Sequence, residues 1–77
     1  MIYQVQSAVE IDSATTQGVA EVRRIMQEQL QADAAADGKE LVGGIRETVR
    51  QRMRNTIDGP KPMLLILTLA SDSRDVD

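Results

Sequence analysis

The chain has 77 residues, a formal net charge of −3, 42% hydrophobic residues and 27% charged residues, which together predict one globular domain. It has no cysteine and no histidine, so disulfides and the common zinc, haem-thiolate and iron–sulfur ligand sets are excluded within this chain. Tyr3 is the only aromatic residue, so the core must be built from aliphatic side chains.

Residues 2–11 alternate between apolar and polar side chains. Tyr3, Val5, Val9 and Ile11 fall on one side of the pattern, which is typical of a half-buried strand. The segment carries no basic region followed by an apolar run, so we expect no signal peptide here.

The period then changes to that of a helix. Val19, Val22, Met26 and Leu30 recur at three- and four-residue steps, and Ser13 is the predicted N-cap. The stretch 32–37 keeps helix propensity but has no large apolar residue, so we expect the helix to fade there.

We predict a second helix from about Lys39 to Ile57. The start of this helix is marked by Asp37-Gly38-Lys39-Glu40, whose Asp-x-x-Glu spacing is related to that of a capping box. Its end is marked by Gly59, Pro60 and Pro62, which act as stop signals. Its apolar face is supplied by Leu41, Val42, Ile45, Val49, Met53 and Ile57. Gly43 and Gly44 conflict with this, since each glycine costs about 1 kcal/mol inside a helix. The alternative is a helix that begins at Ile45, with residues 39–42 as a short extra strand.

The last element is a short apolar strand at 63–70, and residues 71–77 are expected to form a flexible acidic tail. The predicted fold is therefore α+β with the order β-α-α-β, in which two antiparallel strands pack on a helix pair within one domain, residues 1–70. A helix pair covers only one face of the final strand, so we expect a second copy of the chain to extend or cover the sheet. The residues assigned to self-association are Leu64, Leu65, Ile66 and Leu67.

Charge is unevenly distributed along the chain. Residues 1–38 hold six acids and two bases, whereas residues 39–77 hold six acids and seven bases. On the predicted second helix, Arg46, Arg50 and Arg54 line up at four-residue steps and could bind carboxylates or phosphates. Alternatively, these arginines lie along the margin of the core and pair with acids of the first helix, such as Glu21, Glu28 and Asp33.

No pattern for catalysis emerges from the sequence. Without histidine or cysteine, the usual proton-transfer and thiol chemistry is missing, and no phosphate-binding glycine motif is present. The acids Asp72, Asp75 and Asp77 lack the spacing of a calcium loop. We therefore expect no cofactor and no metal.

The expected function is that of a small, soluble, cytoplasmic, non-enzymatic protein that binds a larger protein as an inhibitor, adaptor or regulator. We expect a homodimer that does not bind membranes. The alternatives are a nucleic-acid-associated regulator that uses the basic second helix, and a structural subunit or assembly factor of a larger complex.

Overall fold

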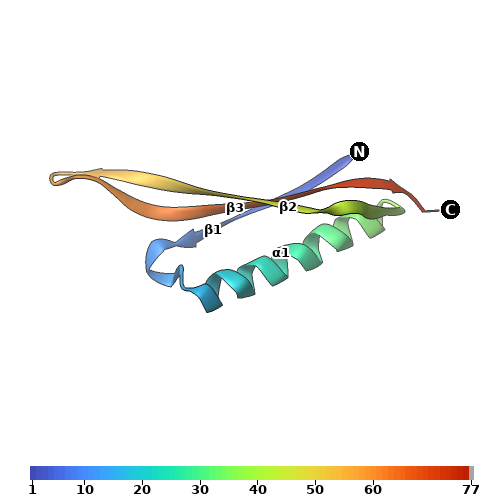
Figure 1. Ribbon diagram of the computed structural model, residues 1–77, viewed down its shortest axis with the longest axis horizontal. Helices are drawn as coiled ribbons and strands as arrows, with labels where there is room; N and C mark the ends of the chain where they lie inside the picture. The colour runs from blue at the N-terminus through green and yellow to red at the C-terminus, as the bar shows by residue number, and fades with distance from the viewer. Residues whose placement is uncertain (77) are drawn as a thin grey trace.

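The computed structural model describes residues 1–76, which form one helix and a three-stranded antiparallel sheet (Figure 1). The strand order is β1-β3-β2, so the two strands joined by the helix are parallel to each other with β3 between them. The elements in chain order are β1 (Ile2–Glu10), the short 3₁₀ turn η1 (Ile11–Ser13), α1 (Thr16–Ala36), β2 (Lys39–Thr56) and β3 (Gly59–Asp75).

The strand and the helix predicted for the first half of the chain are both present. β1 pairs with β3 without a break in register, from Ile2 opposite Asp72 to Glu10 opposite Leu64. The helix cap differs from the prediction: Thr15, not Ser13, accepts a hydrogen bond from the backbone N–H of Gly18 at 3.0 Å. The helix also does not fade after residue 32, because Ala34 is buried against the sheet and the last turn is therefore held by packing.

The predicted second helix is wrong, and with it the β-α-α-β fold on a helix pair. Residues 39–56 are a strand, so the order is β-α-β-β with a single helix. Leu41, Ile45, Val49 and Met53 are four residues apart, and this spacing satisfies both a helix stripe and one face of a strand, where every second side chain points the same way. The periodicity therefore could not distinguish the two structures.

A bulge at Gly43 and Gly44 is the local feature that fits the strand. Their φ angles are 79° and 81°, in the left-handed region that glycine adopts at little cost. The register with β3 shifts between Val42, which faces Asp72, and Arg46, which faces Ala70. The fully buried hydroxyl of Ser71 donates into this bulge, with Val42 O at 3.3 Å and Gly44 O at 3.2 Å. The strand proposed as an alternative at residues 39–42 is thus the start of a much longer one.

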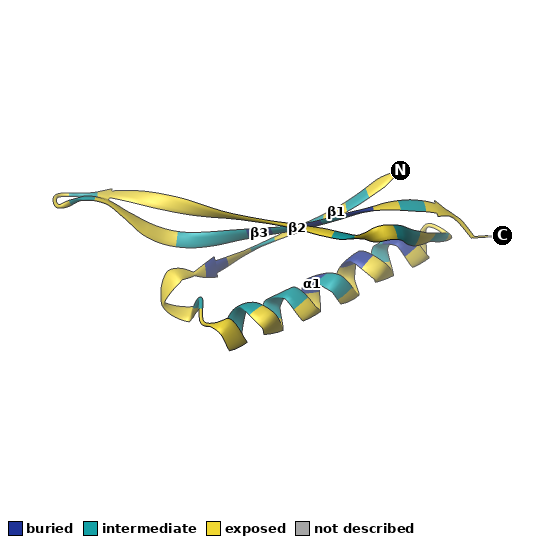
Figure 2. Cartoon of the chain, viewed as in Figure 1, coloured by how far each residue is buried: buried dark blue, intermediate teal, exposed yellow. Residues whose placement is uncertain are grey.

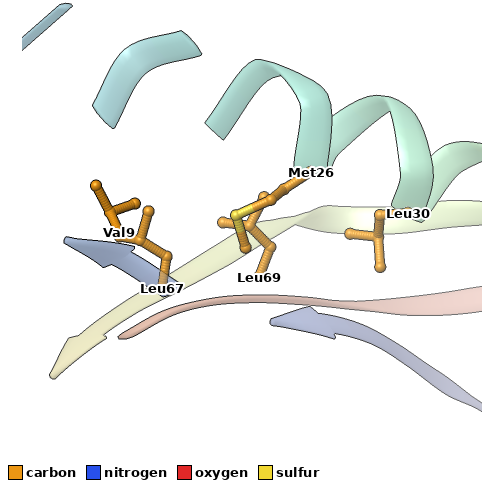
Figure 3. Close-up of a cluster of buried hydrophobic side chains, with 5 residues drawn as sticks. All are labelled: Val9, Met26, Leu30, Leu67 and Leu69. Carbon is orange, nitrogen blue, oxygen red and sulfur yellow. The ribbon is translucent and has the colours of Figure 1, made fainter. Parts of the chain in front are cut away.

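The core lies between α1 and one face of the sheet. Met26 and Leu30 from the helix pack onto Val9 of β1 and onto Leu67 and Leu69 of the central strand (Figure 3). Leu30, Leu67 and Leu69 are at most 1% exposed. In β1, and in β3 from Leu64 onwards, odd-numbered residues therefore face the helix and even-numbered residues face away from it. The register with β2 shifts between Arg52 and Met53, so the first residues of β3 do not keep this alternation.

The final strand is longer than predicted at both ends. β3 begins at Gly59 and runs to Asp75, so residues 71–75, expected to lie in a flexible tail, continue the strand. Lys39 of β2 forms an ion pair with Asp75 at this end, and the backbone N–H of Val76 donates to Gly38 O at 3.1 Å. Residue 77 lies outside the described residues.

The β2–β3 hairpin extends beyond the end of β1 and beyond the helix, as Figure 1 shows at its yellow and orange end. We call this projecting part, residues 53–63, the arm. The molecule is consequently elongated, with principal extents of 57 × 22 × 18 Å. Pro60 and Pro62, predicted to stop a helix, lie in the arm opposite Asn55 and Met53, where β3 has a neighbour on one side only.

Candidate binding surface

The sheet has one face without a covering element. The helix runs along the other face, and Figure 2 shows the arm as mostly exposed. We call the uncovered side, formed by even-numbered residues, the open face. On it, the side-chain amide of Gln6 donates to the hydroxyl of Thr68 at 3.2 Å, which ties β1 to the central strand.

Four arginines line the β2 side of the open face and are all exposed. We call them the arginine row; its members are Arg46, Arg50, Arg52 and Arg54. Arg46, Arg50 and Arg54 were expected on one face of a helix. The alternation of the strand places all four arginines on one side, because they are separated by even numbers of residues. Arg52 was not among the residues selected from the sequence, since on a helix it points away from the other three. The two-residue period of a strand places Arg52 on the same side as the other three arginines.

The arginine row has little intramolecular charge compensation. Arg46 lies 3.6 Å from the carboxylate of Asp72 on β3, and both side chains are 55% exposed. Within residues 1–76, Arg50, Arg52 and Arg54 have no carboxylate at ion-pairing distance.

The helix acids that were the alternative partners of these arginines are used elsewhere. Glu21 and Glu28 both pair with Arg24 of the same helix, and Asp33 accepts a hydrogen bond from the Gln29 side chain at 2.7 Å. These acids lie on the helix, on the other side of the sheet from the arginine row. The two charge groups therefore form separate surfaces.

The residues predicted for self-association are divided between the two faces. Leu67 is 1% exposed and belongs to the core beneath α1, and Leu65 packs at its edge. Leu64 and Ile66 lie on the open face and are half-buried. The open face therefore combines a half-buried aliphatic strip on β3 with a charged strip on β2.

Two hollows follow this boundary. One of about 330 Å³ is lined by Gln6, Arg50, Gln51, Arg52 and Ile66. The other, about 450 Å³, lies where the arm leaves the body, and its lining includes Arg54, Lys61 and Leu64 together with Glu10 and Asp12. Both hollows are open to solvent and shallow, so they suit a protruding group of a large partner better than an enclosed small molecule.

No protein family, characterised protein or solved structure matches this chain. Any function proposed for the chain therefore rests on the chemistry of its own residues.

The titratable groups whose pKa values are shifted lie away from the open face. The hydrogen bond from Tyr3 to Asp37, together with desolvation and the charges of nearby acids, raises the pKa of the phenol to about 12. The hydrogen bond and charge of Arg24 lower the pKa of Glu21, and those of Lys39 lower the pKa of Asp75. Each shift belongs to a surface pair that holds two elements, or two turns of the helix, together.

Among residues 1–76, no three or more carboxylates are grouped so as to hold a metal ion. In the same part of the chain, no helix combines the length and the apolar character needed to cross a membrane.

Proposed function

We propose that this chain is a non-enzymatic binding protein that recognises an acidic surface on a larger protein through the open face of its sheet. Such binding would make it an inhibitor, adaptor or regulator. The observation that carries the proposal is the position of Arg50, Arg52 and Arg54, which have no acidic partner among residues 1–76, beside the half-buried Leu64 and Ile66. Guanidinium groups bind carboxylates in a bidentate manner, and the adjacent aliphatic strip adds apolar contact area.

The shape of the molecule supports a macromolecular partner. The arm projects from the body with the basic residues Arg54 and Lys61 and carries little of the core, so it is available to reach across another surface. Ile57 at its tip is fully exposed, and Met53 is 47% exposed. Exposed apolar side chains next to unpaired charges are typical of binding surfaces that become buried on association.

The test compares two triple variants that have the same net charge. In the first, Arg50, Arg52 and Arg54 are replaced by alanine. In the second, the control, Arg23, Arg24 and Lys39 are replaced by alanine; these basic residues already have acidic partners and do not lie on the open face. The partner is captured from cells of the source organism with the wild-type chain, identified by mass spectrometry, purified, and titrated with each variant.

We expect the first triple variant to weaken the affinity by roughly tenfold or more, which corresponds to ~1.4 kcal/mol. The control is expected to bind like the wild type, since exposed ion pairs contribute little to the fold. Circular dichroism checks that both variants stay folded. Equal affinities of the wild type and the first variant for the purified partner would refute the proposal, as would failure of the wild type to capture any partner.

A second candidate function is binding to nucleic acid. It is favoured by one observation: the arginine row leads onto the two-stranded antiparallel arm, which carries Arg54 and Lys61, and such a ribbon fits the major groove of a DNA duplex. The net charge of −3 and the single aromatic residue argue against it. Binding to a generic duplex that falls steeply as salt rises would favour this candidate, because phosphate contacts release counterions. Absence of retardation at low salt would exclude it.

We also propose that the chain acts as a homodimer in the cytoplasm. The cytoplasmic location is supported by the absence of cysteine, which is common where disulfides do not form. A subunit or assembly factor of a larger complex remains a related proposal, and poor folding of the chain when expressed alone would support it.

A further inference from the structure

The sheet has two edges, β1 and β2, and each exposes backbone groups on its outer side. The N–H of Ser73 donates to Met1 O at 3.0 Å, which sets the alternation of hydrogen bonds along the β1–β3 ladder. Odd-numbered residues of β1 therefore bond to β3, and the N–H and C=O groups of even-numbered residues point outwards. Within residues 1–76, no hydrogen bond from another element reaches the outward groups of Gln4, Gln6 or Ala8.

The two edges differ in how far they are protected from pairing. β2 carries the arginine row and a double-glycine bulge, two features that hinder the addition of another strand. β1 has no proline, no bulge and a single charged residue, Glu10, at its end. A regular edge of nine residues with one charge, at its end, favours the addition of a further strand.

We propose that the strand added to β1 is β1 of a second copy of this chain, in antiparallel orientation about a two-fold axis at Gln6. The result is a continuous six-stranded sheet built from two three-stranded ones. This proposal specifies the surface of the homodimer proposed above and is independent of the acidic partner. It also leaves the open face of each copy free.

The sequence of β1 is compatible with pairing to itself. Centred on Gln6, the outward-bonding residues pair as Gln6 with Gln6, Gln4 with Ala8, and Ile2 with Glu10, so no two like charges are opposed. β2 is not compatible in this way. If β2 of one copy paired with β2 of another in antiparallel orientation, even-numbered residues would lie opposite even-numbered residues. Because the arginine row is even-numbered, arginines of the two copies would then oppose each other.

The helix adds a second, independent observation. Arg23 bonds to Glu47 of β2 at 2.9 Å, so this flank of α1 lies towards β2. Ile25 is roughly 160° away around the helix, which places it on the flank towards β1. It is 53% exposed although it is a large aliphatic residue. Of its neighbours on the helix surface, Gln29 is uncharged, and Glu21 and Glu28 are both paired with Arg24.

The two-fold axis of the proposed dimer is perpendicular to the sheet, so both helices lie on the same side of it. The flanks that carry Ile25 then approach each other across the joined β1 strands. Burial of Ile25 by the second helix would remove its apolar surface from water and so stabilise the dimer.

The test uses two matched lysine substitutions. Gln6 on β1 and Thr48 on β2 face the same central residue, Thr68, from opposite sides, and both are exposed. Gln6→Lys places two lysines opposite each other in the proposed dimer, whereas Thr48→Lys adds the same charge at the other edge. A further variant, Gln6→Pro, removes an outward N–H that the chain's own ladder does not use.

We expect the wild type to sediment as a dimer. Gln6→Lys and Gln6→Pro should raise the dimer dissociation constant by roughly tenfold or more, and Thr48→Lys should leave it unchanged. In the wild-type dimer, the amide of Gln6 should be protected from hydrogen exchange, whereas the outward amide of Val49 on β2 should exchange freely.

A wild-type chain that is monomeric at millimolar concentration would overturn the proposal. So would a dimer that Thr48→Lys dissociates while both Gln6 variants leave it intact. The triple variant of Arg50, Arg52 and Arg54 should remain dimeric, so a failure of the dimer proposal and a failure of acidic-partner binding are distinguishable. Circular dichroism on each variant separates loss of the dimer from loss of the fold.

Discussion

Replacing Gly43 and Gly44 by alanine distinguishes the strand from the helix that the sequence predicted, because the two structures give effects of opposite sign. Inside a helix, each glycine-to-alanine change stabilises by about 1 kcal/mol. In the bulge of β2, both residues have φ near +80°, where an L-residue is disfavoured by about 1–2 kcal/mol. We therefore expect each alanine to destabilise the protein.

The magnitude can be attributed to the backbone alone. A Cβ atom added at either glycine meets no atom within 4 Å beyond its two chain neighbours, so no steric clash with the rest of the protein contributes. A chain of 77 residues has an expected free energy of unfolding of roughly 4–12 kcal/mol. Each alanine should thus remove a measurable part of it and lower the melting temperature by about 4–16 °C.

The assay is urea unfolding followed by circular dichroism, at a fixed protein concentration because self-association contributes to stability. The matched control is D-alanine at the same positions, introduced by chemical synthesis. A D-residue favours positive φ, so it should not destabilise, and it should add about 0.4–1 kcal/mol by restricting the unfolded chain. An increase in the unfolding midpoint for Gly43→Ala or Gly44→Ala would refute the bulge and favour a helix.

Three further predictions concern the core, the bulge and the tyrosine. Leu30→Ala should cost about 2–5 kcal/mol in urea unfolding, because Leu30 is fully buried and its removal leaves a cavity; a smaller loss would mean that the helix is not packed as described. Ser71→Ala should cost about 1–3 kcal/mol in the same assay, since the carbonyl groups of the bulge lose their donor, and an unchanged midpoint would contradict that role. Ultraviolet titration of Tyr3 should show a pKa of about 12 in the folded protein, and Asp37→Ala should return the pKa towards 10.0. Because the folded-state pKa is raised, the stability gained from this hydrogen bond is fully present below pH 10 and is lost as the pH rises towards 12; a phenol pKa of 10.0 in the wild type would exclude the interaction.

The pattern of apolar residues predicted the correct element wherever it fitted only one period, that of a strand or that of a helix. β1 alternates at Tyr3, Val5 and Val9, and the three-residue step from Val19 to Val22 does not fit a period of two, so strand and helix were both predicted. For residues 39–56 the apolar positions were four apart, which fits two periods equally. The pair Gly43-Gly44 was the feature of the sequence that argued against a helix in this segment.

The sequence by itself determined a small aliphatic α+β chain without histidine or cysteine, a first strand, an amphipathic helix and a row of arginines. Only the tertiary structure decided that this row lies on a strand, that Arg52 joins it, and that the acids of α1 lie on the opposite side of the sheet. The physical reason is that pairing between strands far apart in sequence, here β2 with β3 and β3 with β1, provides the hydrogen bonds that select one of two locally acceptable structures.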